Sequence, residues 1–119
     1  HYAYAEAPSA LYGTVERRWN YTMNWRTDGD GQDIPIQIVQ SGRYKISADV
    51  KVAHAIGNLE IVIDKQRLIA PINDGNVLQL GELDLVEGPA DLQIRLIEVP
   101  TNDQLVLDKF TAIKFQRQS

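Results

Sequence analysis

The chain contains no cysteine among its 119 residues. This absence excludes disulfide bonds, thiolate metal ligands and a cysteine nucleophile. A run of about 18 apolar residues is also missing, so no segment is predicted to cross a bilayer as a helix. Acidic side chains outnumber basic ones, 16 to 12, whereas proteins that bind nucleic acid or anionic membranes usually have the opposite balance. We therefore expect neither nucleic acid nor a membrane as a partner.

Catalytic motifs are scarce as well. None of the serines lies in a G-x-S-x-G motif, which would present a serine nucleophile on a sharp turn. Many acidic residues alternate with apolar neighbours, namely Asp49, Glu60, Glu82, Asp84 and Asp91. Such positions predict solvated sheet faces rather than the carboxylate pair of a hydrolase. We expect a protein that is not an enzyme.

The chain does have a hydrophobic alternation of period two, which extends from Ser41 to Phe115. Apolar and polar side chains alternate in residues 45–52 and again in residues 91–96. Several such strands with no helical period predict an all-β fold, an antiparallel β-sandwich of the jelly-roll type with eight or nine strands in one domain. Its buried interface is predicted to contain Ile46, Val50, Leu59, Ile61, Ile63, Leu83, Leu92, Ile94, Leu96, Leu107, Phe110 and Ile113.

Turn residues predict where the strands end. Ser-Gly at 41–42 precedes a long strand. The segments 59–64 and 68–72 flank a short polar stretch, which predicts a hairpin. A further turn is expected at 87–89, and residues 101–103 are expected to close a last hairpin before the final strand pair.

The first forty residues are less regular. Residues 1–10 are expected to form a lead-in or an edge strand. Pro35 lies between Ile34 and Ile36 on the opposite phase. Because proline has no N–H to donate to a sheet, its strand is predicted to lie at an edge or to begin there.

Four segments between residues 41 and 115 together have a family likeness: SGRYKISADV, GNLEIVID, LGELDLVEGPADLQIRL and LVLDKFTAIKF. This succession resembles the galactose-binding-like β-sandwich of carbohydrate-binding module families 6 and 35. It resembles still more the related accessory domains of secreted sulfatases and glycoside hydrolases. The resemblance covers roughly Tyr21 to Phe115 and depends on core and turn positions. In that pattern the LGEL segment makes a hairpin, and LDKFTAIKF is the closing strand.

The resemblance implies a non-catalytic carbohydrate-binding accessory module of an exported carbohydrate-active enzyme, located outside the cell or in the periplasm. Its partners would be a glycan or a neighbouring catalytic domain, and we expect a monomer. Residues 1–10 lack the basic and apolar segments of a signal peptide. An exported chain would then be a mature fragment or an excised module whose signal lay upstream. The family also implies a structural calcium near the N-terminus, with Glu6 and Glu16 as candidates. The alternative is a structural module that packs on a neighbouring domain and binds no sugar.

An aromatic stretch around residues 19–25 is the candidate ligand site. Flat rings stack on the apolar face of a sugar, and nearby polar groups bond its hydroxyls. Trp19 is the first choice for the stacking ring, and the candidate polar contacts are Arg26 and Asp28. Tyr21 and Trp25 are further ligand candidates. The alternative is that both plug the core, because period-two spacing places them on one strand face.

Two patterns could hold a metal. The loop with Asp28, Asp30 and Asp33 clusters hard carboxylate ligands, which together with Glu6 makes calcium binding one interpretation. The spacing does not match an EF-hand, so a solvated turn is the default. His1 with a second histidine, His54, permits a copper brace. The alternative for His54 is a hydrogen-bonded residue at a strand end.

Overall fold

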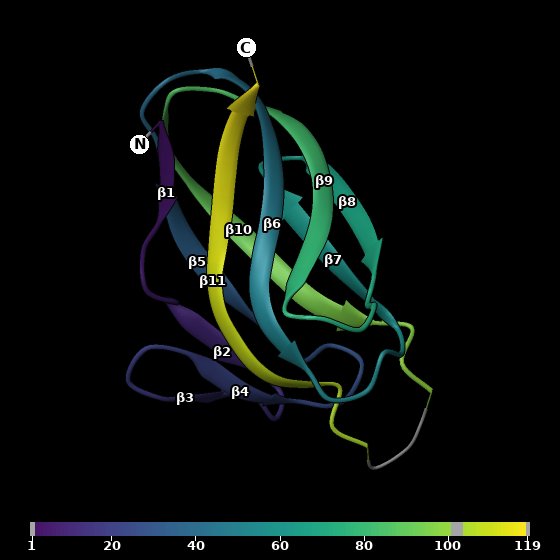
Figure 1. Ribbon diagram of the computed structural model, residues 1–119. Helices are drawn as coiled ribbons and strands as arrows, with labels where there is room; N and C mark the ends of the chain where they lie inside the picture. The colour runs from purple at the N-terminus through teal and green to yellow at the C-terminus, as the bar shows by residue number, and fades with distance from the viewer. Residues whose placement is uncertain (1, 101–103, 119) are drawn as a thin grey trace.

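The computed structural model describes residues 2–100 and 104–118 (Figure 1). Two antiparallel sheets face each other, and the described residues include no helix. The first sheet has the order β1 (Ala3–Ala5), β5 (Gly31–Ile38), β10 (Gly88–Ile97), β7 (Asn58–Ile63), β8 (Gln66–Pro71), and β2 (Ala10–Tyr12) also pairs with β5. The second has the order β3 (Glu16–Arg17), β4 (Thr22–Trp25), β11 (Leu107–Gln118), β6 (Gly42–Val52), β9 (Val77–Leu85). The predicted sandwich is confirmed.

The described residues form eleven strands rather than eight or nine, because the N-terminal segment contributes three short ones. Two of them, β1 and β2, follow one another along one side of the sandwich, and β3 forms a hairpin with β4 at its lower end in Figure 1. In the part of the chain that the structure describes, no helix is long and apolar enough to span a bilayer.

The core lies between the sheets and contains all twelve residues predicted from the alternation. Ile46, Leu59, Ile61 and Leu92 have no exposed surface. Side chains on successive strand positions point to opposite faces, so the apolar phase of each strand meets the apolar phase of the facing sheet. The pattern of the sequence is therefore sufficient to identify the core of this domain.

Strand connections are where the sequence-based predictions were wrong. The hairpin of β7 and β8 is confirmed. However, β9 pairs with β6, whereas β10 pairs with β5 and β7. The turn at 87–89 therefore leads from one sheet to the other, and LGELDLVEGPADLQIRL is no hairpin. β10 and β11 also belong to opposite sheets. The predicted turn at 101–103 lies outside the described residues, but the strands that flank it do not pair as a hairpin.

The strand that contains Pro35 is internal, not an edge. β5 pairs with β10 on one side and with β1 and β2 on the other. Pro35 falls at the interruption between β1 and β2, where its carbonyl accepts a hydrogen bond from the backbone N–H of Glu6. The N and C=O of one residue point to the same side of an antiparallel strand. The missing N–H of Pro35 therefore faces residues 6–9, which belong to no strand.

The predicted shared face of Tyr21 and Trp25 is also wrong. Asn24 has a φ of 69°, a left-handed conformation in the middle of the strand. Its amide donates to the carbonyl of Thr14, and the Thr14 hydroxyl donates to the Asn24 carbonyl. These bonds hold Asn24 in place and shift the alternation by one residue. As a result, Thr22 and Trp25 point into the core.

Candidate functional site

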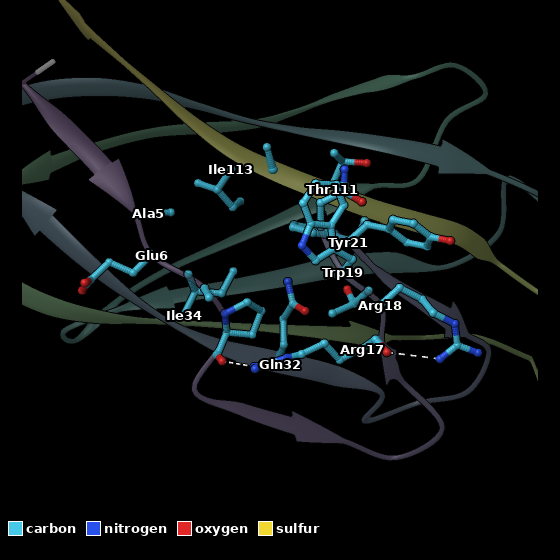
Figure 2. A pocket seen from close by; sticks show the side chains of 16 residues that line it. Ala5, Glu6, Arg17, Arg18, Trp19, Tyr21, Gln32, Ile34, Thr111 and Ile113 are labelled. Carbon is cyan, nitrogen blue, oxygen red and sulfur yellow. Dashed lines mark hydrogen bonds between the residues drawn. The ribbon is translucent and has the colours of Figure 1, made fainter.

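A cavity of about 350 Å³ opens at the side of the sandwich, between the two sheets. Its lining comes from four segments: residues 5–8, residues 17–22, Gln32 with Ile34 on β5, and residues 110–113 on β11 (Figure 2). Ligand pockets usually have volumes of about 300–1,000 Å³. This pocket is therefore large enough for a small ligand and lies at the lower end of that range.

One wall of the pocket is the segment that interrupts the first sheet. Residues 6–9 run between β1 and β2 opposite Pro35, and residues 6–8 line the pocket. The backbone N–H groups of Glu6 and Ser9 donate to carbonyls of β5 at the two ends of this segment. The carbonyl of Pro8 accepts a hydrogen bond from Nη2 of Arg17. This contact connects the wall to the β3–β4 hairpin on the other side of the pocket.

Trp19 stands at the tip of that hairpin. The backbone N–H of Arg18 donates to the carbonyl of Tyr21 at 2.8 Å, which places Trp19 within the tight turn between β3 and β4. Its side chain is 96% exposed although it lines the pocket. Tyr21 is partly buried, and Nζ of Lys109 lies 4.7 Å from its ring centroid. The pocket thus brings together two predicted ligand residues, Trp19 and Tyr21.

Gln32 lies at the opposite, interior side of the pocket and was missed by the sequence analysis. Its side chain is 2% exposed and points from β5 into the pocket (Figure 2). No donor among residues 2–100 and 104–118 reaches its Oε1 atom. The sequence did contain a signal, because Gln32 occupies the same inward phase as Ile34, Ile36 and Ile38. A polar residue at an inward position either has a partner or serves a site.

Comparison with known proteins supports the fold. No protein-family model and no curated protein matches the sequence. Among solved structures, the CBM35 from Cellvibrio japonicus Abf62 superposes with a TM-score of 0.67 at 14% identity, over 98% of this chain and 94% of that one. The Podospora anserina GH26-CBM35 β-(1,4)-mannanase gives 0.59 at 14% identity, over all of this chain and 25% of the other. The chain has the fold of the CBM35 carbohydrate-binding modules.

A third CBM35 structure supports the same conclusion. The module described as Xyl-CBM35 in complex with a glucuronic acid containing disaccharide has a TM-score of 0.52 at 15% identity, over 98% of this chain and 83% of that one. The family resemblance predicted from the SGRY and LGEL segments is therefore confirmed at the level of fold. At these identities the likeness carries no residue-level information about a ligand.

The pocket lining does not include three of the predicted ligand residues, namely Trp25, Arg26 and Asp28. Trp25 has no exposed surface and stacks on Phe110, with ring centroids 5.2 Å apart. Trp25 therefore lies in the core, as the alternative interpretation expected. Its prediction as a ligand-binding residue is wrong, because no ligand in solution can touch a ring enclosed by the core. Arg26 donates from Nε to Oδ1 of Asn24, and Asp28 accepts from the N–H of Val99 at 2.7 Å. Neither Arg26 nor Asp28 lines the pocket.

Asp30 is a buried loop residue whose carboxylate is fully engaged by the protein. Its oxygens accept hydrogen bonds from the N–H groups of Arg26, Thr27 and Thr14 and from the hydroxyls of Thr14 and Thr27, over 2.5–3.3 Å. Burial by itself would raise the pKa of Asp30, but these hydrogen bonds outweigh it, and the pKa lies below its ordinary value. Asp30 stabilises the loop that leads from β4 into β5.

The remaining metal candidates are dispersed. Asp33 accepts from Nη2 of Arg95 at 2.8 Å and from the hydroxyl of Tyr12 at 2.5 Å. Glu6 is exposed at the pocket, and Glu16 forms an exposed ion pair with Arg18. In the described ranges, no three His, Cys, Asp or Glu side chains are grouped so that they could hold a metal ion. The described residues therefore do not fit the calcium site that the family resemblance implied.

The second histidine contacts a backbone carbonyl. His54 is exposed just after β6, and its Nδ1 lies 2.7 Å from the carbonyl oxygen of Leu105. This agrees with a hydrogen-bonded histidine at a strand end. The other half of the hypothetical copper brace, His1, lies outside the described residues.

Chelation can test whether the loop of Asp28, Asp30 and Asp33 binds calcium. A ligand that binds only the folded state raises the melting temperature by mass action. Because all three carboxylates already accept hydrogen bonds from the protein, we expect the melting temperature to be the same in excess calcium and in excess EDTA. A clear decrease in EDTA, measured by calorimetry, would contradict this expectation.

Proposed function

We propose that the chain is a non-catalytic carbohydrate-binding module of an exported carbohydrate-active enzyme, and that it binds its glycan at the pocket beside Trp19. The CBM35-like fold supports this proposal. The observation that carries it is the position of Trp19, which is 96% exposed on the rim of a pocket lined by both polar and apolar side chains.

A tryptophan at the tip of a turn contributes almost no buried surface to the fold. An indole presents a large flat apolar surface, and aromatic side chains bury about 150–250 Å² when covered. A sugar ring can cover one face of the indole, and Arg17, Asn20 and Glu6 beside it offer donors and acceptors for hydroxyls. The pocket therefore combines the two features that carbohydrate recognition needs.

The module would act by attachment rather than by chemistry. Binding of a polymer raises the effective concentration of the linked catalytic domain at its substrate. The neighbouring catalytic domain is thus the second partner in this proposal.

Replacement of Trp19 by alanine tests the proposed site. We expect glycan binding to weaken by about 1–3 kcal/mol, with stacking on nucleic-acid bases as the guide. The free energy of unfolding should change by less than about 0.5 kcal/mol, because the ring is exposed. A glycan array with the wild-type chain selects the ligand, and isothermal titration calorimetry measures the affinity.

The matched control is Tyr4→Ala, since Tyr4 is an exposed aromatic residue on β1 that does not line the pocket. Its affinity should equal that of the wild type. If the wild-type chain binds no glycan on plant, algal and host arrays, the proposal fails, and the alternative of a structural module that packs on a neighbouring domain is favoured.

A further inference from the structure

We propose that Gln32 is a ligand-contacting residue of the pocket, and that its carboxamide accepts a hydrogen bond from an uncharged hydroxyl group of one sugar unit that enters between the sheets. This inference rests on the proposed function. It specifies which group of the ligand lies deepest in the pocket.

The first observation is that the burial of Gln32 destabilises the folded protein when no ligand is bound. A buried polar atom without a partner loses the hydrogen bonds that water gave it in the unfolded chain. Oε1 of Gln32 is such an atom among the described residues. An inward position on a sandwich strand is normally apolar, as Ile34 and Ile36 on the same strand show. A polar side chain at this position is explained if a ligand supplies the missing donor.

The second observation is that Gln32 is held rigidly. In the sheet, Gln32 pairs with Ile94 of β10 on one side and with Leu11 of β2 on the other. The carbonyl of Gln32 also accepts a hydrogen bond from Nη1 of Arg95 at 3.0 Å. Pairing on both edges fixes the backbone that presents the Gln32 side chain to the pocket, which favours precise recognition.

The surroundings of the carboxamide indicate the kind of group that it meets. Ile34, Phe110 and Ile113 line the same pocket, and Thr22 beside them is almost fully buried. The cations of the lining, Arg17 and Arg18, are exposed on the hairpin. A carboxylate or sulfate placed at Gln32 Oε1 would bring its own acceptor oxygen against the acceptor Oε1. The apolar surroundings would also leave its charge without a partner, which is unfavourable. A hydroxyl donates and accepts, so it matches a carboxamide and needs no countercharge.

The pocket volume sets the size of the ligand. At about 350 Å³ it is near the lower limit of ligand pockets. The Pro8–Arg17 hydrogen bond joins two of its walls. One sugar unit that inserts with its hydroxyls first, while Trp19 covers it at the rim, agrees with this enclosure.

The variant Gln32→Leu separates a ligand role from a structural one. Leucine removes the unpartnered acceptor, so we expect the melting temperature of the free protein to rise by about 3–6 °C. The affinity for neutral methyl glycosides, titrated into the wild type and the variant by calorimetry, should fall at least tenfold. A gain in stability together with a loss of binding is the signature of a residue retained for its ligand.

The matched control is Gln37→Leu, the same change on the outward phase of the same strand, which should leave the affinity unchanged. A lower melting temperature of Gln32→Leu with unchanged affinity would overturn the inference. If Trp19→Ala abolishes binding and Gln32→Leu binds as the wild type does, the inference fails while the proposed function stands. If the wild-type chain binds no glycoside, both fail.

Discussion

Replacement of Asp30 by alanine should lower the free energy of unfolding by about 3–5 kcal/mol. The change leaves the backbone N–H groups of Thr14, Arg26 and Thr27 without their acceptor. A donor that loses its partner away from water costs about 1–3 kcal/mol. These three hydrogen bonds are partly buried, so we expect each to contribute near the lower end of that range. Urea denaturation followed by fluorescence measures the effect.

The matched control is Asp74→Ala, which removes an exposed carboxylate from another loop and should change stability by less than about 0.5 kcal/mol. Equal stabilities of the Asp30→Ala and Asp74→Ala variants would show that the hydrogen bonds to Asp30 contribute nothing net.

The stabilisation by Asp30 should depend on pH in a defined direction. The pKa of Asp30 in the folded protein lies below its ordinary value of 3.8. The unfolded state therefore binds the proton more readily, and acid favours unfolding. The contribution is fully present above about pH 4 and is lost as the pH falls through the lower pKa of the folded state. The difference in unfolding free energy between the wild type and Asp30→Asn, measured from pH 7 to pH 2, should be constant at first and then decrease.

The two tryptophans should respond to alanine in opposite ways. Trp25→Ala empties a fully buried site against Phe110 and should cost about 3–5 kcal/mol of unfolding free energy. Trp19→Ala should leave stability nearly unchanged while it weakens glycan binding, since the ring is exposed. Denaturant titration of both variants gives the comparison. If Trp19→Ala destabilised the protein as much as Trp25→Ala, Trp19 would be a structural residue and not a binding platform.

The difference between these two tryptophans shows what a sequence pattern can and cannot resolve. Spacing alone placed Tyr21 and Trp25 on one face, and it was wrong because Asn24 adopts a left-handed conformation. That conformation depends on hydrogen bonds to Thr14, ten residues away. A local pattern contains no information about such a partner.

Strand pairing shows the same limit. The hairpin of β7 and β8 was predictable because both its strands and its turn are adjacent in sequence. The strands β9 and β10 are equally close in sequence and alternate in the same way, yet they lie in opposite sheets. Alternation specifies that a strand has one buried face, but the strand that pairs with it depends on the packing of the whole domain.

The pocket depended on the tertiary structure entirely. Trp19 could be proposed from the sequence as an exposed ring, but its neighbours in the pocket, Pro8 and Gln32, could not. The interruption opposite Pro35 and the contact of Arg17 with Pro8 create the wall. Arg26 and Asp28, which are near Trp19 in sequence, bond instead to groups outside the pocket.

The sequence by itself therefore determined the all-β sandwich, its single core and the family of folds, because burial of alternate side chains is a local and repeated requirement of every strand. Only the tertiary structure decided which strands pair, that Asn24 shifts the alternation beside Trp25, and that a buried glutamine lies in a pocket. Those features arise where segments distant in the chain meet, and their energies come from contacts that no single segment contains.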